Sequence, residues 1–282
     1  KYGYVSLTTR YGNVCMPEIE VVDIAELKCK KLMNGPFSPV LLREIREALE
    51  RREQVILFQN RRGFAPVVEC HVCGWTPQCP HCDVSLTFHK RTNQLTCHYC
   101  GFSTPVPQHC PQCDADRLTG KGYGTERIED VLANIFPEAK VARMDLDTTR
   151  SRSAYEGIIR GFQRGDTDIL IGTQMVTKGL DFRKVSVVGI LNASTMLNQP
   201  DFRSYERAYQ MMTQVAGRAG RSAGNATQTG RPGRVILQVH DAKQPTVMQV
   251  VRGDYEAMFR TQMEERQMFS YPPVCRLIYV YM

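Results

Sequence analysis

The sequence has no long apolar run and only one tryptophan in 282 residues. A helix that spans a bilayer needs roughly 18 or more consecutive apolar residues, and the opening residues, Lys1-Tyr2-Gly3-Tyr4, lack the charged and apolar regions of a signal peptide. From these absences we expect a cytoplasmic protein without a membrane partner. The hydrophobic fraction of 42% is sufficient for a globular core.

Two motifs of nucleotide-hydrolysing enzymes are also absent from the sequence. It contains no Gly-x-x-x-x-Gly-Lys-Ser/Thr phosphate loop and no Asp-Glu box to hold magnesium. The segment Gly120-Lys121-Gly122 lacks both the upstream glycine and the hydroxyl residue of a phosphate loop. The isolated chain is therefore predicted to be inactive as an ATPase.

The composition shows a modest excess of positive charge and a high cysteine count. The formal charge of +7 suits a polyanionic partner, because lysine and arginine that neutralise phosphates release counterions. Many basic proteins bind no nucleic acid, so charge alone does not decide this point. The 11 cysteines lie mostly in close pairs in a chain too large for a disulfide scaffold, which favours thiolates on metal.

Strand-like apolar runs alternate with segments of helical periodicity along most of the chain. Ser38 and Pro39 are typical of a helix start, and the apolar run 54–59 is typical of a buried parallel strand. Later elements are expected as helices at 126–135, 152–163 and 202–214, and as strands at 140–144, 168–172, 185–191 and 234–240. This order predicts the α/β class, with a parallel sheet and helices on both faces.

An insert of some fifty residues, 69–119, interrupts this alternation. It contains four Cys-x-x-Cys pairs: Cys70/Cys73, Cys79/Cys82, Cys97/Cys100 and Cys110/Cys113. Two such pairs complete the tetrahedral sulfur shell that zinc prefers, so the eight cysteines predict two structural zinc ions. A redox dithiol or an iron–sulfur cluster is the alternative, but four pairs in series are more typical of zinc. The five histidines of the insert are expected beside the ions or on the surface rather than as ligands.

The spacing of the pairs does not decide which of them share an ion. We favour nesting, in which Cys70, Cys73, Cys110 and Cys113 hold zinc 1 and Cys79, Cys82, Cys97 and Cys100 hold zinc 2. An insert between two elements of one sheet must leave near the point where it entered, and an outer zinc that joins both ends secures this. The rival is cross-bracing, with the first pair joined to the third and the second joined to the fourth.

The octet Gln214-Val-Ala-Gly-Arg218-Ala-Gly-Arg221 is the sharpest signal in the second half of the chain. If the helix continues through it, the two arginines lie three residues apart on one face. A rigid guanidinium fork can neutralise charge on a phosphoryl group that is held by another surface. We therefore expect Gln214, Arg218 and Arg221 to be catalytic, with the two arginines as candidate arginine fingers. The alternative is that they are ordinary surface residues.

Polar residues also follow the strand expected at 168–172. Ligands of open parallel sheets gather at the carboxyl ends of the strands, so Thr173 is expected to contact a DNA phosphate. Gly179 and Asp181 are expected to face the nucleotide cleft. Taken singly, these residues would be ordinary loop chemistry.

Together these segments resemble the second motor lobe of superfamily 2 helicases. The run Asn60–Pro66, the four cysteine pairs, Gly172–Met175 and the arginine octet match, in order, the family of bacterial primosomal replication-restart helicases. The resemblance covers residues from about 36 to 282. It implies a RecA-like lobe and nested zinc pairing, and we expect Arg61 and Arg62 in its first motif to contact DNA.

The resemblance further implies an ATP-dependent helicase that moves 3′ to 5′, binds abandoned or stalled forks and restarts replication by primosome assembly. Its partners would be forked and single-stranded DNA, single-strand DNA-binding protein and other primosome proteins, and we expect a monomer. ATP and Mg²⁺ would be bound mainly by a first lobe that this chain lacks. The alternative function is a non-catalytic zinc module that only binds DNA or proteins.

The expected domain boundaries follow from these assignments. Residues 1–35 are expected to be a linker or the end of a first lobe. Residues 36–68 and 120–269 would form the RecA-like lobe around the insert 69–119, and residues 270–282 look like the start of a truncated C-terminal domain.

Overall fold

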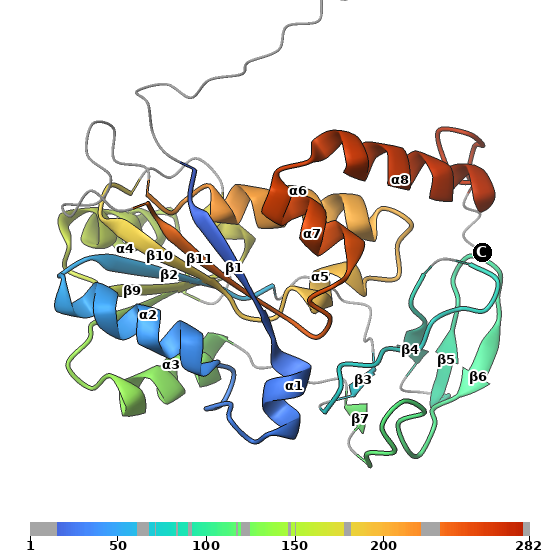
Figure 1. Cartoon of the computed structure of the whole chain (residues 1–282), viewed down its shortest axis with the longest axis horizontal. Coiled ribbons are helices and arrows are strands. Elements are labelled where there is room, and N and C mark those ends of the chain that lie inside the picture. The colour runs from blue at the N-terminus through green and yellow to red at the C-terminus, as the bar shows by residue number, and fades with distance from the viewer. Residues whose placement is uncertain are drawn as a thin grey trace, which may run out of the picture.

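A computed structural model places six parallel strands in one sheet, with a small cysteine-rich insert at its side (Figure 1). It describes residues 16–60, 68–70, 72–82, 84–89, 92–116, 118–119, 125–145, 148–149, 151–177, 182–220 and 232–278. The strand order is β1-β11-β10-β2-β9-β8, and every neighbouring pair in this order is parallel. The strands are β1 (Glu18–Asp23), β2 (Gln54–Phe58), β8 (Val141–Met144), β9 (Ile169–Gly172), β10 (Val185–Ile190) and β11 (Arg234–Val239). The predicted parallel α/β sheet is thus confirmed.

Helices cover both faces of this sheet, and each face has its own apolar core. On one face lie α1 (Ile24–Cys29), α2 (Pro39–Glu50) and α3 (Thr125–Ile135). On the other lie α4 (Arg152–Arg164), α5 (Ser194–Leu197), α6 (Ser204–Ala216), α7 (Pro245–Arg252) and α8 (Tyr255–Met268). The central strands β2, β9 and β10 are buried along their whole length, which explains their continuous apolar sequence. Among the described residues, no helix is long and apolar enough to cross a bilayer.

Local signals at two helix ends agree with the sequence. The side chain of Ser38 accepts a hydrogen bond from the backbone N–H of Leu41 at 3.2 Å, and Pro39 is the first residue of α2. At the C-terminus of α4, Gly165 adopts φ 90°, a conformation that costs glycine little and ends the helix. These ends place α2 and α4 where their apolar faces meet the sheet.

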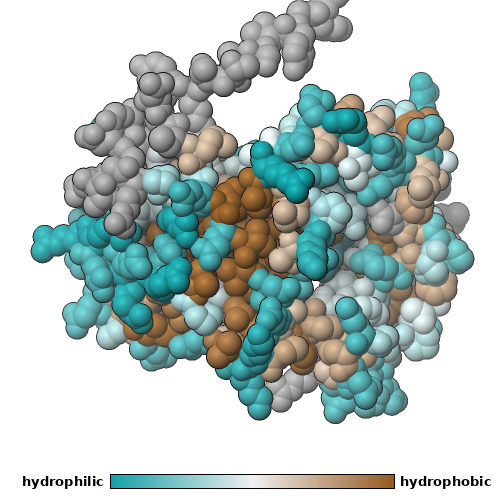
Figure 2. Space-filling view, in the orientation of Figure 1, coloured by the Kyte–Doolittle hydropathy of each residue, from teal (hydrophilic) through white to brown (hydrophobic). Residues whose placement is uncertain are grey.

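The edge strand β1 lies in a segment that was not expected to belong to this sheet. Residues 1–35 were assigned to a linker or a first lobe, but Glu18–Asp23 pairs in register with β11. Arg234 of β11 reinforces the pairing through ion pairs with Glu18 at 2.7 Å and Glu20 at 2.6 Å. Residues 18–23 therefore form an edge strand of the main sheet. Figure 2 shows hydrophobic residues gathered near the centre of the face in view, where Figure 1 draws this strand.

Gln238, the last but one residue of β11, connects this strand to the segment 36–38 and to Leu191. Its side chain accepts a hydrogen bond from the backbone N–H of Ser38 at 2.8 Å. It donates to the carbonyl oxygens of Pro36 at 2.8 Å and Leu191 at 2.9 Å. The residue is fully buried, so this amide satisfies backbone groups that would otherwise lack partners.

The insert forms two small sheets of its own. Strands β3 (Glu69–Cys70) and β7 (Leu118–Thr119) are antiparallel and join its first and last residues. Strands β4 (Thr87–His89), β5 (Gln94–Thr96) and β6 (Ser103–Pro105) form a three-stranded antiparallel sheet. The chain thus leaves the insert beside its entry point, as the topological argument for nesting requires.

Candidate functional site

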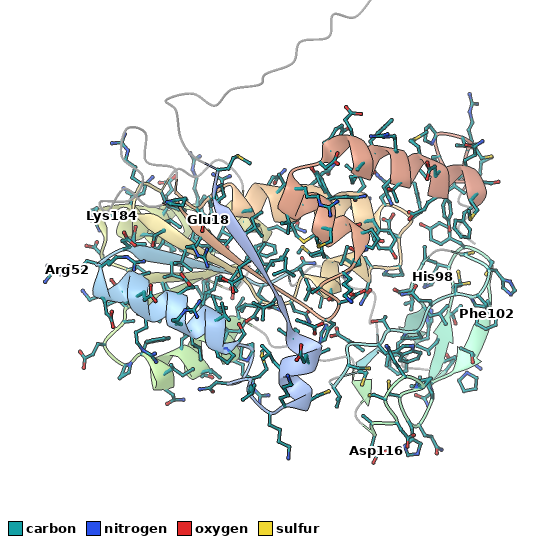
Figure 3. The ribbon with its side chains drawn as sticks, in the orientation of Figure 1. Glu18, Arg52, His98, Phe102, Asp116 and Lys184 are labelled. Carbon is teal, nitrogen blue, oxygen red and sulfur yellow. The ribbon has the colours of Figure 1, made fainter. Side chains whose placement is uncertain are left out.

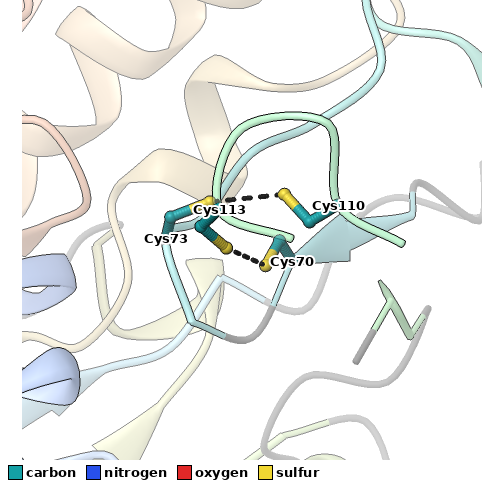
Figure 4. Close-up of side chains that lie close together, drawn as sticks. All are labelled: Cys70, Cys73, Cys110 and Cys113. Atoms are coloured by element: carbon teal, nitrogen blue, oxygen red, sulfur yellow. Dashed lines mark hydrogen bonds between the residues drawn. The ribbon is translucent and has the colours of Figure 1, made fainter. Parts of the chain in front are cut away.

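The first tetracysteine cluster lies at the base of the insert, next to the β3–β7 pair. Its sulfur atoms come from Cys70, Cys73, Cys110 and Cys113 and lie within 4.8 Å of one another. Figure 4 shows the two close sulfur pairs, Cys70 with Cys113 and Cys73 with Cys110, each at 3.6 Å. Each pair of cysteines sits on a tight turn, closed by a hydrogen bond from the N–H of Gly74 to the Cys70 carbonyl at 2.9 Å and from Asp114 to Cys110 at 2.8 Å.

The second tetracysteine cluster lies beside the β4–β5–β6 sheet. It contains Cys79, Cys82, Cys97 and Cys100, again with all sulfurs within 4.8 Å. The backbone N–H groups of His81 and Tyr99 point at the sulfurs of Cys79 and Cys97, at 3.5 and 3.4 Å. The structure therefore has the nested grouping and not the cross-braced one.

Both clusters fit zinc by their chemistry. Burial and then the neighbouring thiols raise the pKa of Cys73 and of Cys82, so four thiolates can coexist in each cluster only beside a cation. Zn²⁺ with four sulfur ligands forms such closed, structural sites. The apolar core of the insert is small, with Val68, Val84, Leu86, Leu95 and two of the ligand cysteines, so metal binding has to supply much of its folding free energy. Neither cluster includes a histidine among the described residues.

A cluster of polar side chains connects the segment beside the first tetracysteine cluster to the six-stranded sheet. His240 lies directly after β11, and its Nδ1 is 3.4 Å from Oε1 of Glu69. Nε2 of His240 is 2.9 Å from Nζ of Lys28. Asn192 donates a hydrogen bond to the same Glu69 oxygen at 3.4 Å. Burial raises the pKa of Glu69, and the Lys28 ammonium offsets part of the rise. This contact could not be expected from local sequence patterns, because Lys28 and His240 are 212 residues apart.

The candidate motor residues fall at opposite ends of the sheet. Thr173 follows the carboxyl end of β9, on the side where the insert leaves the sheet, and is 8% exposed. The octet lies at the other end, because the N–H of Gly220 bonds to the carbonyl of Val185, the first residue of β10, at 3.0 Å. Figure 3 shows Lys184 and Glu18 at this amino end, far from the labelled residues His98 and Phe102 of the insert. Residues on these two sides can thus serve different ligands.

The octet does not continue as one helix, contrary to the expectation. Helix α6 ends at Ala216, with Gly217 as its cap, and Gly220 adopts φ 68°, which a helical residue cannot do. Gln214 is exposed on the last turn, whereas Arg218 is 8% exposed. The burial of Arg218 favours a structural role within its own lobe. The remaining expected residues, Arg61, Arg62, Gly179, Asp181 and Arg221, lie outside the described residues.

Comparison with known proteins identifies two regions of the chain. The PriA DNA helicase Cys-rich region domain matches residues 79–105, and the helicase conserved C-terminal domain matches residues 123–223. The replication restart protein PriA of Bacillus subtilis is 42% identical over 275 residues, which cover 96% of this chain and 33% of that protein. The protein of the same name from Haemophilus influenzae is 40% identical over 273 residues, or 97% of this chain and 36% of the relative.

This chain spans about a third of the length of these relatives. Among solved structures, S. cerevisiae Dbp5 bound to RNA and ADP BeF3 covers 93% of this chain and 48% of its own, with 13% identity and a TM-score of 0.38. That likeness is too low to carry an argument about a site.

Proposed function

We propose that this chain, a homologue of the PriA replication restart proteins with their Cys-rich region and a helicase C-terminal domain, forms the second motor lobe of an ATP-dependent DNA helicase. The motor would move 3′ to 5′ on DNA, bind abandoned or stalled forks and restart replication through primosome assembly. Single-strand DNA-binding protein and other primosome proteins would be its partners, and it would act as a monomer.

This proposal rests on the separation of the candidate residues between the two ends of the sheet. A motor lobe needs one surface for nucleic acid and another for a nucleotide held by its partner lobe. Here Thr173 and the zinc insert lie at the carboxyl ends of the strands, while the octet reaches the amino ends. We expect Arg61 and Arg62 to contact DNA together with Thr173, and Gly179 and Asp181 to contact the nucleotide together with the octet.

ATP and Mg²⁺ would be held mainly by a first lobe. A phosphate loop and an Asp-Glu box are both absent from the 282 residues, so this chain lacks the motifs that usually bind the phosphates and magnesium of ATP. Of the two arginines, Arg221 is our finger candidate, because Arg218 is buried in its own lobe. Residues 36–68 and 120–269 would form the RecA-like lobe, to whose sheet β1 adds residues 18–23, and residues 270–282 would be the start of a C-terminal domain.

An arginine substitution in the full-length protein tests the proposal. Arg221→Ala should lower DNA-stimulated ATP turnover by about a thousandfold, as is typical when an arginine finger is lost. Arg260→Ala is the matched control, because Arg260 is exposed on α8, and it should have no effect. A loss below roughly tenfold at Arg221 would return this arginine to an ordinary surface role.

A non-catalytic zinc module is the second candidate function. The observation that favours it is the absence of a phosphate loop from this chain, since a guanidinium group without a nucleotide has nothing to neutralise. The two functions differ in one measurement. A full-length protein that binds forked DNA but hydrolyses no ATP would support the binding module and exclude the motor.

A further inference from the structure

Three aromatic rings join the second tetracysteine cluster to the lobe. Tyr99 lies between Cys97 and Cys100, and its ring centroid is 6.4 Å from that of Phe202 and 5.5 Å from that of Tyr271. The rings of Phe202 and Tyr271 stack at 5.0 Å with an interplanar angle of 22°. These are the separations at which aromatic pairs attract one another beyond simple burial.

Polar and charged groups tie the same rings to two helices. The backbone N–H of Phe202 donates a hydrogen bond to the Tyr99 hydroxyl at 3.4 Å. Cζ of Arg266, on α8, lies 5.5 Å from the Phe202 ring centroid, and the same guanidinium pairs with Glu206 on α6. Arg266 and Glu206 have side chains only 15% and 17% exposed, so this pair is better shielded from solvent than an ordinary surface ion pair.

Tyr271 forms the centre of the group. It is 6% exposed, and its hydroxyl has no hydrogen-bond partner of normal geometry among the described residues. Burial, followed by the nearby Cys82 and Tyr99, raises the pKa of this hydroxyl. The Tyr271 ring thus lies against Tyr99 of the second cluster and against Phe202 of the lobe, and its hydroxyl lies near Cys82.

Helix α6 extends from this aromatic group to the arginine octet. Phe202 lies two residues before its start at Ser204, and the helix ends at Ala216. A helix of 13 residues is roughly 20 Å long. Tyr209, Met212 and Val215 pack its length against the sheet. A packed helix of this kind can carry a displacement from one end to the other.

We propose that Phe202 and Tyr271 are positioning residues that make the second tetracysteine cluster move together with α6, so that nucleotide-driven motion of this lobe carries the zinc insert with it. This inference rests on the proposed function for its role in unwinding. The mechanical connection itself is a property of the described residues and can be tested separately.

The first test measures coupling in the intact, full-length protein. Phe202→Leu and Tyr271→Leu should leave DNA-stimulated ATP turnover within about twofold of the wild type, while base pairs unwound per ATP fall by about fivefold or more, the lower end of typical coupling between sites. Tyr271→Phe keeps the ring and should behave as the wild type. Phe259→Leu is the matched control, because Phe259 is 47% exposed on α8 and lies outside the group.

The second test needs no ATP and separates this inference from the proposed function. Zinc release to a coloured chelator should show one of the two ions leaving about tenfold faster in Phe202→Leu and Tyr271→Leu, as is typical when residues supporting metal ligands are lost. The other ion, and both ions in Phe259→Leu, should leave at the wild-type rate. If the full-length wild-type protein hydrolyses no ATP, the proposed function is refuted, but the zinc-release measurement still tests this inference.

Two results would overturn the inference. One is zinc release at the wild-type rate for both ions in Phe202→Leu and Tyr271→Leu. The other is an unchanged number of base pairs unwound per ATP in variants that retain two zinc ions. Loss of ATP turnover in step with unwinding would also count against it, because it would indicate general damage to the lobe rather than lost coupling.

Discussion

Replacing Gly74 with alanine should destabilise the first tetracysteine cluster more than the same change at Gly101 in the second. Both glycines close a cysteine knuckle with φ 77°, so alanine suffers the same backbone strain at either position. Their surroundings differ. A Cβ on Gly74 would lie 2.1 Å from Cγ of His240, whereas a Cβ on Gly101 would meet no atom within 4 Å.

The size of the effect follows from these two contributions. Alanine in the left-handed region costs about 1–2 kcal/mol in both knuckles. At Gly74 the imidazole ring must also be displaced, and overpacking of this kind typically costs about 1–3 kcal/mol more. A chain of this size loses roughly 2–4 °C of melting temperature per kcal/mol. The difference between the two variants should therefore be between about 2 and 12 °C.

Thermal unfolding of the zinc-saturated chain measures this difference directly. Gly101→Ala serves as the control for backbone strain, and a second pair of variants isolates the ring. With His240→Gly as the background, which also removes the His240 Cβ atom 2.5 Å from the added methyl group, Gly74→Ala should cost no more than Gly101→Ala does. Equal losses for the two single variants, or an extra loss at Gly74 that persists without the ring, would refute the contact between the zinc knuckle and β11.

Three further results are expected. Cys82→Ser and Cys110→Ser should each lower the zinc content from two ions to one, whereas Cys275→Ser, outside both clusters, should retain two; loss of both ions from one variant would contradict two independent sites. Because the pKa values of Cys73 and Cys82 are raised, zinc must displace protons, so chelator competition should show affinity falling as the pH is lowered from about 8 to about 6. Gln238→Leu should lower the free energy of unfolding by about 3 kcal/mol or more in denaturant titrations, since it leaves three buried backbone groups without partners; Gln210→Leu, at an exposed site, should not.

Much of the sheet could be predicted because its signals are local. The continuous apolar sequences of β2, β9 and β10 reflect burial on both faces, and Ser38 with Pro39 marked the start of α2 correctly. The sequence also indicated two metal sites, since a Cys-x-x-Cys pair is itself a local structure. Their nested grouping required a further argument about where the chain enters and leaves the insert.

Long-range pairing could not be predicted in this way. Nothing near Glu18–Asp23 indicates that its partner is β11, more than 200 residues later. The same holds for His240, which lies alone after an apolar strand yet contacts Glu69 beside the first cluster. The octet shows the opposite difficulty. Its spacing suggested one helical face, but α6 ends at Ala216 with Gly217 as its cap, and Gly220 adopts a positive φ. Glycines that break a helix at a packed surface are hard to distinguish from glycines that allow close approach.

Steady-state ATP hydrolysis in the presence of forked DNA tests the central claim most directly. The 282-residue chain alone should show no turnover above background, because it lacks a phosphate loop, while the full-length protein should show turnover that DNA stimulates. Turnover by the isolated chain, or none by the full-length protein with both zinc ions bound, would contradict the assignment of this lobe to a two-lobed motor.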